Sequence, residues 1–221
     1  MLLWLTLSLL PSVPNCNSKH EVRKIVPLPE PRRRGEMTLE ETLQLRRSVR
    51  SYTTEPITLP HLSQLLWAAQ GITSEEGFRT APSAGALYPL ETYVVAGNVK
   101  GLPPGIYKFI PSGHELMNIR EGDFRKALSE ESFDQQHIEE AAVDIVIAAV
   151  YERTTEKYGQ RGRRYVHMEA GHVGQNICLQ AQSLDLGVCA NGAFDDDEVK
   201  KVLGLPEDED PLYIISVGRP W

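Results

Sequence analysis

Hydrophobic residues recur at helical spacing in four segments of the chain, at residues 38–47, 58–71, 164–186 and 195–204. The first helix is expected to begin at Thr38, because Thr38 and Glu41 have the spacing of a capping box. The fourth is expected to begin after Asp195, a favourable cap, and to end at Gly204. These signals are local, so they predict where the helices begin and end.

Two further glycines mark expected helix ends. Gly71 suits a left-handed closing residue for the second helix, and Gly187 is expected to stop the third. The third helix is the longest and apolar enough to be central, with its apolar side formed by Ala170, Val173, Ile177, Leu179, Ala181 and Leu184.

Runs rich in β-branched and aromatic residues predict six strands, at residues 92–96, 106–110, 116–119, 145–150, 187–190 and 212–217. Helices and strands are mixed without regular alternation, and several neighbouring strands are close enough to pair as hairpins. This order predicts an α+β fold. Since no strand leads into a Gly-x-Gly-x-x-Gly helix start, the sequence predicts no dinucleotide-binding Rossmann domain.

The first 37 residues are expected to form an apolar segment followed by an extended arm. Residues 1–10 are apolar but too few to span a bilayer, which needs about 20. They lack a cationic start and a small-residue cleavage site, so we expect a cytoplasmic protein. Export or membrane association through residues 1–10 is the alternative. Residues 11–37 hold five prolines and a triple arginine, which leaves 38–221 as the folded domain.

Composition narrows the classes of partner. A chain of 221 residues fits one domain. With a net charge of −7 and no long basic stretch, it is not expected to bind nucleic acid. Cys16, Cys178 and Cys189 fit neither a disulfide framework nor a zinc site, and the latter two are expected to be buried. The six histidines form no ligand pattern, so no metal site is predicted.

Arginines and hydroxyls gather at residues 46–51, the sequence Arg-Arg-Ser-Val-Arg-Ser. Guanidinium groups bind phosphate oxygens in pairs, which lysines do with less geometric definition. We therefore expect residues 46–51 to bind a terminal phosphate group. The alternative is that these cations only complement the negative end of the first helix, which is worth about 0.3–1 kcal/mol.

A second segment, Pro82-Ser-Ala-Gly-Ala-Leu-Tyr-Pro89, runs through small residues between two prolines. Its backbone is able to approach a planar ring without obstruction by side chains. Together, a phosphate site and a surface for a flat ring indicate flavin mononucleotide. A plain turn before a strand is the alternative for this segment alone.

These two segments are followed by Gly-His-Val-Gly-Gln-Asn at 171–176 and Asn-Gly-Ala-Phe-Asp-Asp at 191–196. In this order, from about Thr38 to the end, the chain resembles the nitroreductase superfamily and its SagB-type dehydrogenase branch, which includes the azoline oxidases. The resemblance implies a nitroreductase-like fold, a central, mainly antiparallel sheet flanked by helices with a long central helix. It also implies an FMN-binding domain at 38–221 and a homodimer with the flavin at its interface.

The resemblance assigns cofactor-binding residues. It implies that Asn191 and Gly192 donate backbone N–H groups to flavin N5 and O4, for which an ordinary strand-to-helix turn is the alternative. A basic residue near the C-terminus, here Arg219, is expected at the phosphate. Ala86 and Tyr88 stand where other nitroreductases have asparagine and commonly glutamine, which points to the SagB-type branch. The remaining assigned residues are Arg46, Arg47, Ser48, Arg50, Pro82, Ser83, Ala84, Gly85 and Leu87.

Lys157 and Tyr158 are the catalytic candidates, because azoline oxidases use a Lys-Tyr pair and this one precedes the long helix. The lysine would stabilise an anionic reduced flavin or take a substrate proton, and the tyrosine would donate or relay a proton. By composition alone, the pair is expected in a polar surface loop. Glu169 and His172 are expected to be structural or dimer contacts.

The sequence therefore predicts an FMN-dependent oxidoreductase that transfers hydride through flavin N5. The hydride would pass from NAD(P)H to an acceptor, or from a carbon of a small-molecule or peptide substrate to the flavin. One alternative is a peptide thiazoline or oxazoline dehydrogenase that works with a cyclodehydratase partner. Another is a flavin-binding or flavin-storage protein without turnover.

Overall fold

The computed structural model describes residues 24–221, and its centre is a seven-stranded sheet in the order β1-β6-β5-β3-β7-β9-β8. Every pair of neighbouring strands in it is antiparallel. Its strands are β1 (Ile25–Pro27), β3 (Leu90–Ala96), β5 (Gly105–Ile110), β6 (Glu115–Glu121), β7 (Val143–Ala149), β8 (Gly187–Asn191) and β9 (Asp210–Gly218). A separate parallel pair joins β2 (Ile57–Thr58) to β4 (Val99–Lys100).

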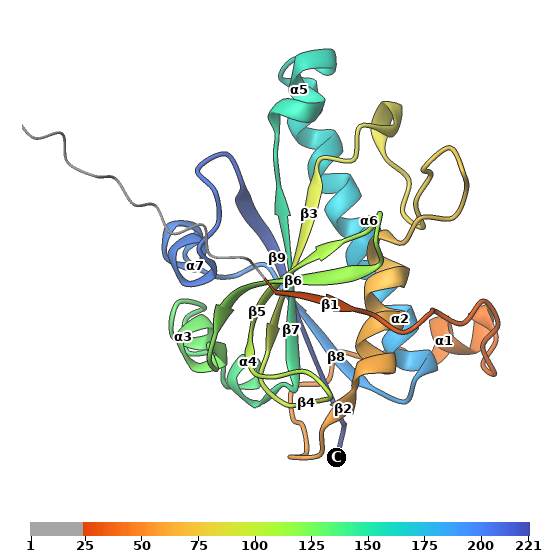
Figure 1. Ribbon diagram of the computed structural model, residues 1–221, viewed down its shortest axis with the longest axis vertical. Coiled ribbons are helices and arrows are strands. Elements are labelled where there is room, and N and C mark those ends of the chain that lie inside the picture. The colour runs from red at the N-terminus through yellow and green to blue at the C-terminus, as the bar shows by residue number, and fades with distance from the viewer. Residues whose placement is uncertain (1–23) are drawn as a thin grey trace, which may run out of the picture.

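Helices lie on both sides of the sheet (Figure 1). On one side are α1 (Leu39–Leu45), α2 (Leu59–Gln70) and α6 (Arg161–Ser183). On the other are α3 (Arg125–Glu130), α4 (Gln136–Glu140) and α7 (Asp196–Leu203). The short helix α5 (Glu152–Tyr158) follows β7 and leads into α6. The predicted α+β class, the mainly antiparallel sheet and the long helix are confirmed.

The sheet is buried on both faces. Val94 and Ile145 pack with Val173 of α6 in one cluster, and Val95 and Val146 pack with α3, α4 and α7 in the other. Every residue of β7 is buried. Each fully buried aliphatic side chain stabilises the fold by about 1.5–3 kcal/mol, so the sheet is a rigid base for the loops at its ends.

Two predicted caps are confirmed. Thr38 Oγ1 accepts a hydrogen bond from the Glu41 N–H at 3.2 Å, and Glu41 Oε2 accepts one from the Thr38 N–H at 2.8 Å. Asp195 accepts from the Glu198 N–H, and Gly204 ends α7 in the left-handed region at φ +65°. These contacts span few residues, which is why the sequence alone identified them.

Two glycine predictions are wrong. Gly71 follows α2 with φ −62° and ψ 142°, so it is not left-handed. A Cβ at Gly71 would lie 2.2 Å from Cδ1 of Trp67, which explains the glycine by packing. Gly187 does not stop the long helix, because α6 ends at Ser183 and Gly187 begins β8. There a Cβ would lie 2.8 Å from Cγ1 of Val49.

Part of the predicted arm joins the sheet. β1 pairs with β6, and Arg32 exchanges two hydrogen bonds between its backbone and the Gln64 side chain. The apolar segment 1–10 and Cys16 lie outside the described residues. The domain boundary at residue 38 stays a prediction. Within residues 24–221, the helices are too short or too polar to cross a bilayer.

Candidate functional site

The arginine segment lies along β8, at the edge of the sheet. The Val49 N–H donates to the Val188 carbonyl at 2.9 Å, and Ser48 forms a bridge with Val188. Tyr52 is buried, and its hydroxyl donates to the carbonyls of Val49 and Ser216. Burial raises the pKa of the Tyr52 phenol far above its usual value, so this group stays neutral. The segment is thus fixed to the sheet while Arg46, Ser48 and Arg50 remain partly or fully exposed.

The C-terminal arginine comes to the same edge. The Thr53 N–H donates to the Arg219 carbonyl at 2.8 Å, and Tyr52 forms a bridge with Pro220. Arg219 Nε is buried and has no hydrogen-bond partner within residues 24–221. The structure therefore brings Arg219 beside the segment that carries Arg46 and Arg50, although 169 positions separate Arg219 from Arg50 in the chain.

Arg47 is engaged differently from its neighbours. Its Nη1 donates to the carbonyls of Gln44 and Arg46 at 2.9 and 2.8 Å, at the end of α1. This is the helix-end role that the sequence offered as the alternative. Its contribution to a phosphate site stays a prediction.

Asn191 is the last residue of β8, and Gly192 follows it as an exposed residue. The Asn191 side chain is buried, and its Oδ1 lies 2.9 Å from Nε2 of His137 on α4. Gln135 Nε2 donates to the Ala193 carbonyl at 2.8 Å. Gln135, which precedes α4, and His137 of α4 therefore fix the end of β8 and the turn after it. The sequence did not predict the contact with His137.

The segment from Pro82 to Pro89 forms a compact turn around a short 3₁₀ helix at Ala84–Ala86. Gly85, Ala86 and Tyr88 have φ values of +64°, +54° and +47°. The left-handed region costs non-glycine residues about 1–3 kcal/mol each, so the surroundings must impose this conformation on Ala86 and Tyr88. Pro82 is exposed, and Ser83, Ala84 and Leu87 are half-buried.

Glu169 of α6 anchors this turn. Its Oε1 accepts from the Ala84 N–H at 2.9 Å, and its side chain is only 5% exposed. Burial raises the pKa of the Glu169 carboxyl. The sequence placed Glu169 among structural contacts and missed its link to Ala84. The sequence does contain a signal for this contact. Glu169 lies three residues after Val166 and four before Val173, so a carboxylate stands on the apolar face of the helix.

Lys157 and Tyr158 lie on α5, and not in the loop that composition predicts. They meet the turn at Gly85, where a Cβ would lie 2.8 Å from Tyr158 Oη and 2.9 Å from Lys157 Nζ. The Tyr158 ring packs edge-on against Tyr165 with a centroid distance of 5.3 Å. Both polar groups are therefore next to the turn that the sequence assigns to a flat ring.

The two sets of predicted residues contact α6 at different heights. Ala84 binds Glu169, whereas Arg46, which follows α1, is close enough to Cys178 for its positive charge to offset part of the rise in that thiol's pKa. Nine residues separate these two positions on α6, which corresponds to about 14 Å along its axis. Within one chain, the arginine segment and the turn at Gly85 thus lie at different levels of α6.

A cavity of about 780 Å³ opens beside α1, between the arm, α2 and α6. None of the predicted cofactor-binding or catalytic residues lines it. Arg33 stacks over Trp67 at its border, with 5.0 Å between the guanidinium carbon and the ring. The lining includes Arg32, Arg33, His61, Trp67, Asn176 and Gln180.

The cysteines of the described chain, Cys178 and Cys189, are free and buried, as predicted. Burial raises the pKa of Cys178 to about 11 and also raises that of Cys189, so neither is a ready nucleophile. Within residues 24–221, no group of three or more histidine, cysteine or carboxylate side chains is arranged to hold a metal ion.

Comparison with known proteins gives close and distant relatives. A protein of Methanocaldococcus jannaschii, named as a candidate nitroreductase, is 48% identical over 83% of this chain and 92% of its own length. The crystal structure of a candidate nitroreductase from Ralstonia eutropha has a TM-score of 0.79 at 32% identity, covering 89% of this chain and 90% of that one.

Two distant relatives have more informative names. The FMN reductase (NADPH) of Bacillus subtilis is 26% identical over 81% of this chain and 65% of its own length. The microcin B17-processing protein McbC of Escherichia coli is 26% identical over 58% of this chain, which spans about half of that protein (49%). The family described as "Nitroreductase family" matches residues 43–219. The chain therefore belongs to the nitroreductase family of flavin-dependent oxidoreductases.

Proposed function

We propose that this oxidoreductase binds FMN and transfers hydride through flavin N5, from NAD(P)H to an acceptor or from a substrate carbon to the flavin. The observation that carries the proposal is the contact of Lys157 and Tyr158 with Gly85, in the turn assigned to the flavin ring. A bound flavin supplies an atom, N5, that accepts and donates hydride. The FMN reductase (NADPH) relative supports NADPH as a reductant.

The chain's own residues suit this cofactor. Arg46, Arg50 and Arg219 collect positive charge at one sheet edge of a protein whose net charge is −7, which favours a phosphate there. Arg219 Nε is a buried donor without a partner in the described chain, so this edge has unused hydrogen-bonding capacity. Asn191 and Gly192 would offer backbone N–H groups to the ring, from a turn that His137 and Gln135 hold.

Lys157 and Tyr158 would handle charge and protons at the ring. As an ammonium, Lys157 would stabilise negative charge on the reduced ring; as a neutral amine, it would instead remove a proton from the substrate as hydride leaves. The Tyr158 hydroxyl donates or relays that proton. Gly85 permits this arrangement, because any side chain there would displace both groups.

We further propose a homodimer with the flavin at its interface. Within one chain, the α6 residues beside the turn and beside Arg46 lie about 14 Å apart along the helix. In the proposed dimer, a second copy would bring a turn at Gly85 to each arginine segment. Leu39, Leu43 and Leu45 of α1 are 60%, 54% and 51% exposed, next to Arg46. Such apolar side chains are suited to an interface between copies. A mass measurement in solution, with and without FMN, tests the dimer.

A second candidate is a peptide thiazoline or oxazoline dehydrogenase of the SagB-type branch, which would work with a cyclodehydratase partner. It is favoured by Ala86 and Tyr88 at two positions of the turn, by the Lys157–Tyr158 pair, and by the similarity to McbC. Incubation of the yellow protein with a cyclised azoline peptide in air separates the candidates. Formation of the aromatic ring without NAD(P)H supports the dehydrogenase, and an unchanged peptide opposes it.

The main experiment is an absorbance spectrum of the purified protein, followed by anaerobic titration with NADPH and NADH. A yellow protein that bleaches with a reduced nicotinamide and recolours in air supports the proposal. A colourless protein that refuses added FMN overturns it, and a yellow protein that no donor reduces favours flavin storage. The double variant Arg46→Ala, Arg50→Ala is expected to lose FMN, while Lys157→Ala stays yellow and turns over slowly.

We also propose that the protein acts in the cytoplasm. Cell fractionation tests this location.

A further inference from the structure

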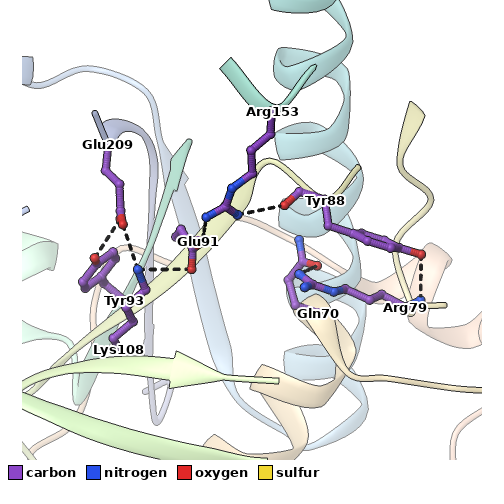
Figure 2. Close-up of polar contacts among 8 residues, drawn as sticks. All are labelled: Gln70, Arg79, Tyr88, Glu91, Tyr93, Lys108, Arg153 and Glu209. Carbon is purple, nitrogen blue, oxygen red and sulfur yellow. Dashed lines mark hydrogen bonds and ion pairs between the residues drawn. The ribbon is translucent and has the colours of Figure 1, made fainter. Parts of the chain in front are cut away.

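A chain of polar contacts runs from α2 through the turn at Tyr88 to the middle of the sheet, as Figure 2 shows. It links α5 to β3, because Arg153 lies on α5 and its ion-pair partner Glu91 lies on β3. In order, its members are Gln70, Arg79, Tyr88, Arg153, Glu91, Lys108, Glu209 and Tyr93. None of these residues was assigned a role by the sequence, except that Tyr88 marked a branch of the family.

Tyr88 is held at several points. Its N–H donates to Ser83 Oγ at 2.9 Å, and its carbonyl accepts from Arg153 Nη1 at 3.1 Å. Its hydroxyl accepts from the Arg79 N–H at 3.2 Å, and the Arg79 guanidinium carbon lies 4.4 Å from its ring centroid. Since Tyr88 has φ +47°, these contacts impose a conformation that the residue would not adopt by itself.

Arg153 is itself fixed to the sheet. Its Nη2 lies 2.6 Å from Glu91 Oε1, and Glu91 Oε2 lies 3.2 Å from Lys108 Nζ. Lys108 pairs in turn with the buried Glu209 at 2.8 Å, and Glu209 accepts from the Tyr93 hydroxyl at 2.7 Å. Along these ion pairs, the charges of Arg153, Glu91, Lys108 and Glu209 alternate in sign and sum to zero. Arg153 is therefore the exposed end of a neutral, partly buried network.

The same arginine lies one helical turn before Lys157 on α5, at the i, i+4 spacing of side chains on one helix face. α5 has only seven residues, and Thr154 is its one buried residue. Thr154 and the Tyr158 ring pack against α6, and Arg153 adds the polar contacts of α5 with the turn and the sheet. Arg153 thus joins the helix that carries Lys157 and Tyr158 to the turn that both of them touch.

We propose that Arg153 is a positioning residue for the catalytic pair. By bonding both Glu91 and the Tyr88 carbonyl, it keeps Lys157 Nζ and Tyr158 Oη against Gly85, where the flavin ring is expected. This inference rests on the proposed function, in which Lys157 and Tyr158 act on the flavin and substrate. Arg153 itself touches neither reactant and acts through the geometry of the pair.

The test is a double-mutant cycle in the FMN-loaded protein, with the rate of flavin reduction by NADPH and the FMN dissociation constant as readouts. Arg153→Gln is expected to slow reduction about 10-fold or more, since small misplacement of reacting groups is costly. FMN affinity is expected to fall less than the rate, because the network does not reach the arginine segment proposed to hold the phosphate. Arg153→Lys should recover part of the rate, since an ammonium retains the ion pair with Glu91.

If Arg153 acts through the pair, adding Arg153→Gln to the variant Lys157→Ala, Tyr158→Phe will not slow the reduction further. Multiplicative losses would overturn the proposal, as would a normal rate in Arg153→Gln. Lys126→Met is the matched control, because it removes an exposed cation with a weak i, i+4 partner on α3. Its rate should be unchanged.

Hydrogen exchange of residues 83–90 and 152–159 provides a readout that does not depend on turnover. Faster exchange in Arg153→Gln, absent in Lys126→Met, is expected; equal exchange overturns the positioning role. Glu91→Gln serves if Arg153→Gln does not fold, and it should reproduce both the slower rate and the faster exchange. If Lys157→Ala reduces normally, the proposed catalytic pair fails, whereas faster exchange in Arg153→Gln still supports its hold on the turn.

Discussion

Alanine in place of Gly85 tests the contact between the turn and the catalytic pair. The new Cβ would lie 2.8 Å from Tyr158 Oη and 2.9 Å from Lys157 Nζ. An ordinary van der Waals contact begins at about 3.4 Å. The hydroxyl must therefore move by about 0.6 Å (3.4 − 2.8) and the ammonium by about 0.5 Å (3.4 − 2.9). Both are ends of flexible side chains, so they are able to move without unfolding the protein.

The expected losses of stability and of rate differ in size. Gly85 has φ +64°, and an alanine there costs about 1–2 kcal/mol, offset in part by a less flexible unfolded chain. For a protein of this size, about 1 kcal/mol lowers Tm by about 2–4 °C. A misplacement of about 1 Å can cost about 100-fold in rate, so about half that displacement should cost on the order of 10-fold.

Gly77→Ala is the matched control for backbone strain. Gly77 has φ +83°, and nothing lies within 4 Å of a Cβ built there. Both variants should show similar thermal shifts by calorimetry, but only Gly85→Ala should slow anaerobic flavin reduction by NADPH. If both reduce flavin at the same rate, the contact with Lys157 and Tyr158 has no part in the reaction and the reasoning fails.

Two further predictions concern buried polar groups. Burial raises the pKa of the Asp144 carboxyl well above 3.8. At a pH between 3.8 and this raised pKa, the folded protein keeps a proton that the unfolded chain releases. The free energy of unfolding therefore falls as pH rises between these two pKa values. Asp144→Asn should flatten the pH dependence measured by urea unfolding between pH 4 and 8; an unchanged slope contradicts this assignment. His137→Leu leaves the buried Asn191 Oδ1 with only the weak Cys189 thiol donor at 3.9 Å, so we expect a loss of about 1–3 kcal/mol in urea unfolding and faster release of bound FMN. Unchanged stability would refute the role of His137.

The sequence predicted the features of the fold that depend on near neighbours. The capping box of Thr38 and Glu41 and the end of α7 at Gly204 involve contacts within a few residues. Gly71 and Gly187 were misjudged because their reasons are tertiary, namely the Trp67 ring and the Val49 side chain. α5 escaped prediction because it has no apolar stripe.

The candidate site shows the same division. The arginine segment and the small-residue turn were found because each is a contiguous motif with its own chemistry. The contacts of Glu169, Arg153 and His137 were missed because their partners lie 54 to 85 positions away in the chain. No spacing rule links such pairs, and only the folded sheet and α6 bring them together.

The position of residues 46–50 along β8 also bears on solubility. β8 is the last strand of the sheet, and an uncovered strand offers unpaired backbone groups to other molecules. Here the Val49 N–H donates a hydrogen bond to the Val188 carbonyl, so the segment proposed to bind the phosphate also covers that strand. Substitutions that detach this segment should accordingly expose β8 and make the protein self-associate more readily.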